Sequence, residues 1–117
     1  MQNFRKLNVY IKSKELVIQV YDLLQHFPPE EKYGLCDQLR RAVISVPSNI
    51  AEGLGRSSDK DTSHFLHIAY GSLMEVLAQL DIACDLNYIT ADEFTKIEQV
   101  VIDVIKLLKG LINKFTN

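Results

Sequence analysis

The sequence predicts an all-α protein, an antiparallel up-down-up-down four-helix bundle in which residues 1–117 form one domain. Three observations support this prediction. Apolar residues recur at spacings of three and four in four separate stretches, which is the period of an amphipathic helix. No stretch alternates apolar and polar residues over a useful length, as a half-buried strand does. The connections between the four stretches are short, and short connections favour antiparallel neighbours.

The first predicted helix covers residues near 8–26. Its apolar stripe consists of Tyr10, Val17, Val20, Tyr21 and Leu24. The segment Phe27-Pro28-Pro29 follows. We expect it to end the helix, because a proline restricts the residue before it and has no N–H to donate to a helical hydrogen bond.

The second predicted helix spans residues 35–54 and contains a proline. Its stripe consists of Leu35, Leu39, Ala42, Val43, Val46, Ile50 and Leu54. Because this stripe keeps its phase through Pro47, we expect a kink there rather than an end, with the carbonyl of Val43 crowded by the ring. Asn49 is expected to satisfy backbone groups freed by the proline, a ligand contact being the alternative. Gly53 and Gly55 are expected to supply flexible backbone for the exit.

Two further stripes predict the third and fourth helices. They consist of Leu66, Ala69, Leu73, Val76, Leu77, Leu80 and Cys84, and of Phe94, Ile97, Val101, Val104, Ile105, Leu108, Ile112 and Phe115. Ser58 is placed to cap the third helix. Thr90 and Glu93 have the spacing of a capping box before the fourth. Residues 87–89 are expected to form a tight turn between the two helices.

Composition narrows the class of protein. Apolar residues make up 47% of the chain and charged residues 24%, which excludes a disordered protein. No apolar run approaches the roughly 20 residues of a membrane span, and no signal-peptide pattern opens the chain. We therefore expect a cytoplasmic protein without a membrane partner. Cys36 and Cys84 lack a C-x-x-C spacing and are expected to be buried free thiols.

Charge is unevenly distributed along the chain. The net charge is −2, which argues against a strongly basic nucleic-acid binder. Residues 1–56 contain eight basic and six acidic side chains, whereas residues 57–117 contain five and nine. Any anion-binding surface is therefore expected to use the first half of the chain.

A second face lies away from the core on the second and third predicted helices. On the second helix it consists of Arg41, Ser45, Ser48, Glu52 and Arg56, with Arg40, Ile44, Pro47 and Ala51 beside them. On the third it consists of His64, Ile68, Gly71, Glu75, Ala78 and Ile82. These faces are small, apolar and sparsely charged, which predicts self-association. Gly71 and Ala78 allow another backbone to approach closely. The alternative is that both helices simply have wide apolar arcs.

Polar residues of the chain allow three chemical interpretations. Glu52 and Glu75 have the chemistry of an acid and a base, but a carboxylate opposite an arginine is more often a structural ion pair. His64 and His67, with His26, match no metal-binding signature. The loop G-L-G-R-S-S (53–58) precedes a helix but lacks the third glycine or the lysine of a phosphate-binding motif. We therefore predict no catalytic residue, no metal and no cofactor.

Two segments carry a family resemblance. P-S-N-I-A-E-G-L-G-R-S (47–57) and F-L-x-I-A-x-G-S-L-x-E (65–75) resemble the small bacterial four-helix-bundle proteins encoded by intervening sequences in 23S ribosomal RNA genes. These proteins are related to the accessory variability protein of diversity-generating retroelements. The resemblance implies an up-down bundle, commonly a homopentameric ring, with no known catalytic activity. For the retroelement relatives it implies a basic ring surface that binds nucleic acid and a reverse transcriptase.

The family pattern marks residues that coincide with the second face. They are Arg40, Arg41, Pro47, Asn49, Glu52, Gly53, Gly55, Arg56, Gly71, Ser72 and Glu75. The resemblance thus implies a non-enzymatic oligomeric accessory protein, most simply a pentamer. The candidate groups for binding RNA or an RNA-handling protein are Arg40, Arg41, Arg56 and Ser57. The candidate interface or structural polar residues are Ser48, Asn49, Glu52, Gly71, Glu75 and Ala78.

A scaffolding oligomer without a nucleic-acid role is the alternative. In that case the arginines form interface ion pairs, and the carboxylates of Glu52 and Glu75 neutralise them. One departure from the relatives favours this alternative: the nucleic-acid-binding relatives are strongly basic, whereas this chain carries a net charge of −2, which several copies multiply. An enzyme using Glu52, Glu75 and a histidine is a third possibility, for which the sequence contains no partner constellation.

Overall fold

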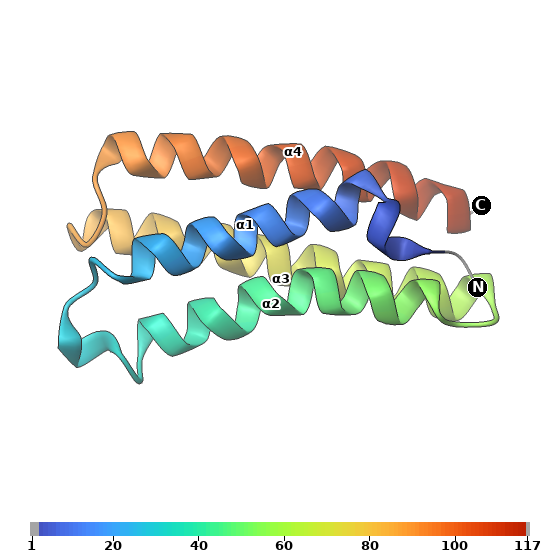
Figure 1. Ribbon diagram of the computed structural model, residues 1–117, viewed down its shortest axis with the longest axis horizontal. Coiled ribbons are helices and arrows are strands. Elements are labelled where there is room, and N and C mark those ends of the chain that lie inside the picture. Colours follow the sequence, from blue (N-terminus) through green and yellow to red (C-terminus); the bar gives the residue numbers. More distant parts are fainter. Residues whose placement is uncertain (1–2, 117) are drawn as a thin grey trace.

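The computed structural model describes residues 3–116, which form four long helices (Figure 1). These are α1 (Asn8–Leu24), α2 (Leu35–Leu54), α3 (Asp59–Asp85) and α4 (Ala91–Phe115), with short 3-10 helices η1 (Phe4–Lys6) and η2 (Pro29–Glu31). The four α-helices contain 17, 20, 27 and 25 residues, more than three quarters of the chain. No strand occurs within residues 3–116. The predicted all-α class is confirmed.

The helices form an elongated bundle of 43 × 25 × 22 Å. Successive helices run in alternate directions, and both described ends of the chain lie at the same end of the bundle (Figure 1). Each helix packs against two neighbours: α1 against α2 and α4, and α3 against α2 and α4. Over the part of the chain described here, no helix is long and apolar enough to cross a membrane.

All four helices contribute to one apolar core. Its fully buried large side chains include Leu16, Leu39, Ile50, Leu66, Leu73, Leu80 and Leu108. The predicted stripes of the last three helices supply most of this core. The predicted stripe of the first helix was partly wrong, because Tyr21 is 39% exposed whereas Val9 and Ser13 are buried. The Ser13 hydroxyl donates to the carbonyl of Tyr10 at 2.7 Å, and this bond lets a polar residue occupy a core position.

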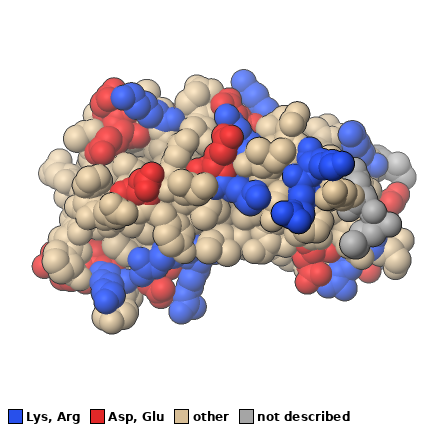
Figure 2. Space-filling model, in the orientation of Figure 1, with Lys and Arg blue, Asp and Glu red and all other residues tan. Residues whose placement is uncertain are grey.

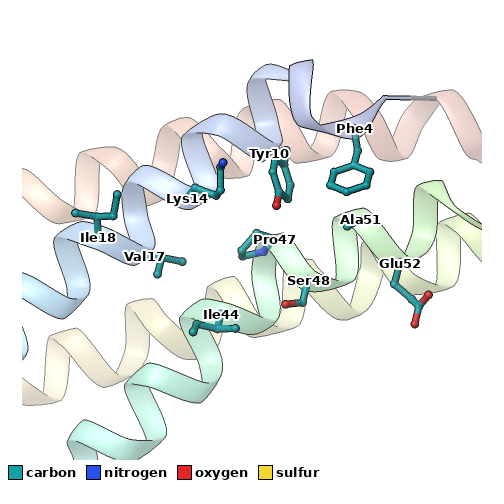
Figure 3. A pocket seen from close by; sticks show the side chains of 10 residues that line it. All are labelled: Phe4, Tyr10, Lys14, Val17, Ile18, Ile44, Pro47, Ser48, Ala51 and Glu52. Atoms are coloured by element: carbon teal, nitrogen blue, oxygen red, sulfur yellow. The ribbon is translucent and has the colours of Figure 1, made fainter. Parts of the chain in front are cut away.

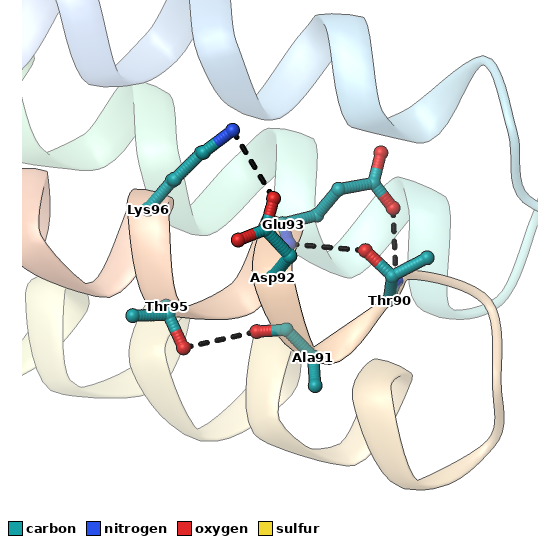
Figure 4. A network of polar contacts seen from close by, with 6 residues as sticks. All are labelled: Thr90, Ala91, Asp92, Glu93, Thr95 and Lys96. Atoms are coloured by element: carbon teal, nitrogen blue, oxygen red, sulfur yellow. Dashed lines mark hydrogen bonds and ion pairs between the residues drawn. The ribbon is translucent and has the colours of Figure 1, made fainter.

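The predicted helix starts are confirmed. The Ser58 hydroxyl accepts a hydrogen bond from the backbone N–H of Asp61 at 3.1 Å, before α3. Thr90 and Glu93 form the capping box of α4, with bonds of 3.0 and 2.8 Å (Figure 4). Between α3 and α4, Asn87 has a φ of 63°, a left-handed conformation that asparagine tolerates better than most residues. Both cysteines are free, but Cys84 is only half-buried, unlike the buried Cys36.

α2 continues through Pro47 to Leu54, as its unbroken stripe predicted. The prediction that Asn49 satisfies a backbone group freed by Pro47 was wrong. Asn49 Nδ2 donates to the carbonyl of Ser45 at 2.8 Å, whereas the carbonyl deprived of a donor by the proline is that of Val43. An asparagine side chain in a helix reaches back about one turn, and one turn before Asn49 lies Ser45.

The role predicted for Gly53 was also wrong. This glycine lies inside α2, is buried, and, like the other glycines in residues 3–116, has no positive φ. A Cβ atom here would lie 3.0 Å from the Cβ of Phe65 and 3.1 Å from the carbonyl oxygen of Thr62. Gly53 therefore allows the close approach of α2 and α3, rather than a flexible exit. Gly55, the residue after the helix, has an ordinary φ of −87°.

Candidate functional site

The contact between α2 and α3 uses Ser45, one of the polar residues predicted on the second face of α2. The Ser72 hydroxyl donates to the Ser45 hydroxyl at 2.8 Å, and Asn49 Nδ2 donates to the same hydroxyl at 2.8 Å. Nearer the end of α2, the buried Thr62 hydroxyl donates to the carbonyl of Gly53 at 2.7 Å. The Ser45–Ser72 bond therefore joins two helices of one chain. Asn49 bonds to Ser45 from the same helix, and Ser48 is exposed.

Each of the three predicted arginines has a partner within the chain. Arg40 Nη2 donates to the carbonyl of Lys32 at 3.0 Å. Arg41 Nε lies 3.2 Å from an Asp37 carboxylate oxygen. Arg56 Nη2 lies 3.5 Å from a Glu52 carboxylate oxygen. The guanidinium carbon of Arg56 also lies 4.5 Å from the centre of the Phe65 ring.

The arginines do not form one cluster within a subunit. At about 1.5 Å per residue, Arg41 and Arg56 are roughly 22 Å apart along the axis of α2. Arg41 is the most accessible of the paired arginines, with 81% of its side chain exposed, compared with 42% for Arg56. Ser57 is exposed in the connection between α2 and α3. The predicted second face of α2 is therefore a line of residues along the helix, with Arg41 at one end and Arg56 at the other.

The fold does not bring together the groups considered for catalysis or metal binding. Glu52 lies beside the end of α2 that contacts Thr62, and Thr62 is 13 residues, or roughly 20 Å along α3, from Glu75. His64 lies in the first turns of α3, whereas His26 lies beside Glu93 near the start of α4, at the other end of the bundle. Within residues 3–116 no group of three or more His, Cys, Asp or Glu side chains is arranged to hold a metal ion.

The outer side of α3 is exposed as predicted. We define the outer α3 stripe as His64, Ile68, Gly71, Glu75, Ala78 and Ile82, which are all exposed and follow one another at spacings of four and three. Ile68 is 39% and Ile82 50% exposed. A Cβ atom added to Gly71 would meet nothing within 4 Å. No helix within residues 3–116 covers this stripe, and its spacing is that of a helix–helix seam.

A groove between α1 and α2 has a volume of approximately 680 Å³ (Figure 3). We call it the α1/α2 groove. Its apolar walls are formed by Tyr10, Val17, Ile18, Ile44, Pro47 and Ala51. Phe4 lies at one end, with its ring centre 4.9 Å from that of Tyr10. Sequence reasoning placed Ile44 and Pro47 on an outer face, which is right for the exposed Ile44 and wrong for Pro47, which is buried. It missed the α1 wall, although Ile18, outside the predicted core stripe of its helix, was a signal for it.

Near the α1/α2 groove, basic side chains outnumber acidic ones in η1 and the first half of α1. Figure 2 shows basic side chains gathered over η1 and the first half of α1. Arg5, Lys6, Lys12 and Lys14 belong to this part of the chain, where Glu15 is the one acidic residue before Asp22. Lys12 is paired with Glu15 at 3.3 Å. Lys14, a residue of the groove, is placed over the Tyr10 ring, 5.1 Å from its centre.

Comparison with known families gives a match over residues 5–110 to the family described as 23S rRNA-intervening sequence protein. The chain belongs to this family. A solved structure from Bacteroides thetaiotaomicron, described as a protein with unknown function from the S23 ribosomal protein family, is similar with a TM-score of 0.81 and 27% sequence identity. The similarity covers 89% of this chain and 97% of that one. No curated protein matches the sequence.

The two segments that carry the family resemblance lie against each other. The first contains Gly53, and the second contains Phe65, whose Cβ limits the space at that glycine. The second also contains Ser72, which bonds to Ser45 on α2. Part of the family pattern therefore specifies how closely α2 and α3 pack. Gly71 and Glu75 are exceptions, because both are exposed on the outer α3 stripe.

Proposed function

We propose that this protein is a non-enzymatic, cytoplasmic subunit of a homo-oligomeric accessory assembly, most simply a pentameric ring. The assembly binds RNA or an RNA-handling protein. The outer α3 stripe carries the self-association part of the proposal. An exposed glycine inside a helix costs roughly 0.5–1 kcal/mol relative to alanine. Within residues 3–116 Gly71 contacts nothing that requires a glycine. Gly110 on α4 shares this property, but Gly71 lies on one stripe with the exposed Ile68 and Ile82, so contact with a second molecule accounts for it best.

The exposure of Arg41 favours RNA as the further partner. Its ion pair with Asp37 lies in water, with 81% and 39% of the two side chains exposed. Such pairs contribute about 0–1 kcal/mol, so phosphate oxygens compete with the carboxylate at little cost. Arginine contacts to phosphates position a nucleic acid without reading its bases. We therefore expect binding that depends weakly on sequence and strongly on salt.

The deciding experiment titrates a structured RNA at low and moderate salt. The variant Arg41→Ala/Arg56→Ala is compared with Lys96→Ala, because Lys96 also forms an exposed i,i+4 ion pair, with Asp92 at 3.1 Å (Figure 4). Arg40 is left intact because it holds the carbonyl of Lys32. We expect the arginine variant to lose affinity at least several-fold, with a shallower salt dependence, and the lysine variant to match the parent.

A scaffolding assembly without RNA is the second candidate. The three intrachain arginine contacts favour it, because they are the contacts that structural arginines make. If the parent assembles but binds no RNA at low salt, the scaffold explains the protein and the RNA role is rejected. The self-association itself is measured separately. A native mass equal to the 13.4 kDa of one chain at micromolar concentration contradicts it.

A further inference from the structure

The outer α3 stripe is nearly symmetric about a single charged residue. Ile68 and Ile82 lie seven residues before and after Glu75, and the small residues Gly71 and Ala78 lie between them. Glu75 takes part in none of the ion pairs within residues 3–116. The stripe is thus an apolar, closely approachable ridge with one unpaired carboxylate at its centre.

This symmetry disfavours contact between two copies of the same stripe. If two α3 helices packed antiparallel about Glu75, the two carboxylates would face each other across an apolar contact. Like charges facing each other at an interface cost several kcal/mol. The partner of the stripe is therefore a different surface, one that is apolar, concave and positively charged.

The α1/α2 groove has these properties. Two of its apolar side chains are prominent: Ile18 is 63% and Ile44 43% exposed. Two charged residues line the groove, Lys14 and Glu52. Glu52 is paired with Arg56 at 3.5 Å, whereas Lys14 forms none of the ion pairs within residues 3–116. Groove and stripe therefore each combine exposed isoleucines with one unpaired charge, and the two charges have opposite signs.

We propose that the outer α3 stripe of one copy docks in the α1/α2 groove of the next copy, with Glu75 facing Lys14. This inference rests on the proposed self-association and adds its geometry. The two surfaces lie on different sides of one subunit, so the contact is head-to-tail: every copy offers a stripe to one neighbour and a groove to another. A head-to-tail contact generates a ring when its rotation closes.

The first test reverses the charges. Lys14→Glu and Glu75→Lys are each compared with the parent, with Lys14→Glu/Glu75→Lys, and with the control Lys106→Glu, an exposed site on α4 outside both surfaces. Circular dichroism checks the fold, and sedimentation velocity measures assembly against concentration. We expect each single reversal to raise the dissociation constant about 10- to 100-fold. The double reversal should return it to within a few-fold of the parent, and the control should leave it unchanged.

The second test removes one surface at a time without relying on the Lys14–Glu75 pair. Ile18→Arg blocks the groove, and Ile82→Arg blocks the stripe. Both side chains are at least half exposed, so both variants should fold. We expect each variant alone to be monomeric. Mixed at high micromolar concentration they should form a 1:1 heterodimer and nothing larger, because the mixture retains one intact groove and one intact stripe.

The outcomes separate this inference from the proposed function. A parent that is monomeric at every concentration rejects the self-association and this inference together. A parent that assembles while neither isoleucine variant dissociates rejects only the docking described here. A stripe-intact Ile18→Arg variant that still forms homodimers shows stripe-to-stripe contact and also overturns it. If each single charge reversal dissociates the assembly and the double reversal does not restore it, the proposed contact between Glu75 and Lys14 is rejected.

Discussion

The hydroxyl of Tyr88 donates a 2.8 Å hydrogen bond to the carboxylate of Glu31, 57 residues earlier in the chain. The other oxygen of the same carboxylate accepts the backbone N–H of Leu35 at 3.2 Å, at the start of α2. The Tyr88 ring also packs on Phe27, with ring centres 5.3 Å apart. One carboxylate thus ties the connection between α1 and α2 to the turn between α3 and α4.

The Tyr88–Glu31 hydrogen bond makes the free energy of unfolding depend on pH. The hydrogen bond from Tyr88 is the largest cause of a lowered pKa for the Glu31 carboxyl, followed by the bond from the Leu35 N–H. Because the folded-state pKa lies below the unfolded-state value, the stabilisation is complete above the ordinary carboxyl pKa and is lost as pH falls through the lowered value. The same bond raises the pKa of Tyr88. That contribution is present below the ordinary tyrosine pKa and is lost as pH rises through the raised value.

We predict that Tyr88→Phe lowers the free energy of unfolding at neutral pH and that this difference from the parent shrinks in acid. The substitution removes the donor and leaves the ring packing on Phe27 in place. Urea unfolding at about pH 7 and about pH 3 measures the effect, and Tyr33→Phe is the control because the Tyr33 side chain is 85% exposed. A difference between Tyr88→Phe and the parent that is the same at both pH values contradicts the role assigned to Glu31.

We also predict that Gly53→Ala destabilises the subunit. An added Cβ would lie 3.0 Å from the Phe65 Cβ and 3.1 Å from the Thr62 carbonyl oxygen. Overpacking of this kind costs about 1–3 kcal/mol, more than the roughly 0.5–1 kcal/mol that alanine gains over glycine within a helix. Gly55→Ala is the matched control, because its nearest contacts are ordinary ones of 3.6 and 3.7 Å. Denaturant unfolding should show Gly53→Ala less stable than the parent and Gly55→Ala at least as stable.

The four helices could be predicted because their signals are local. The stripe of α2 kept its phase through Pro47, and the hydroxyls of Ser58 and Thr90 cap helices that begin one residue later. Gly53 shows where this reasoning stops. A glycine near a helix end indicates a flexible exit when only its neighbours in the sequence are considered. Its real role depends on how closely α3 approaches, which no spacing along one helix specifies.

The candidate site was predictable to a similar extent. The exposed outer α3 stripe followed from helical spacing alone. The partners of Arg41 and Arg56 lie four residues before them, at Asp37 and Glu52, and this spacing is itself a sequence signal for an ion pair. The contact of Arg40 with the carbonyl of Lys32 depends on the path of the preceding loop. The α1/α2 groove depends on how two helices diverge, so the sequence alone did not reveal it.

The hydroxyl pair between α2 and α3 gives a third prediction. Ser72→Ala removes the donor to Ser45, whose oxygen still accepts from Asn49. Because no buried group is left without a partner, we expect a loss of about 0.5–1.5 kcal/mol in the free energy of unfolding. Ser48→Ala, at an exposed position on the same helix as Ser45, should change stability by less. A double-mutant cycle with Ser45→Ala checks that the loss comes from this pair, since independent effects would simply add.

The last prediction compares two exposed glycines, one on the outer α3 stripe and one on α4 outside it. Gly71 in α3 and Gly110 in α4 are both exposed within long helices, and an added Cβ would meet nothing within 4 Å at either site. Arginine has a higher helix propensity than glycine by roughly 0.5–1 kcal/mol. Both Gly71→Arg and Gly110→Arg should therefore fold, with subunit stability equal to or above that of the parent in urea unfolding.

Their effects on assembly should differ. Gly71 lies on the outer α3 stripe, where a long charged side chain prevents another backbone from approaching and places a cation in an apolar contact. Gly110 lies outside both proposed surfaces. Sedimentation velocity at matched concentrations should show Gly71→Arg as a folded monomer and Gly110→Arg with the oligomeric state of the parent. If Gly71→Arg keeps the parent assembly, the outer α3 stripe is not an interface. In that case contact between copies does not explain the glycine at position 71.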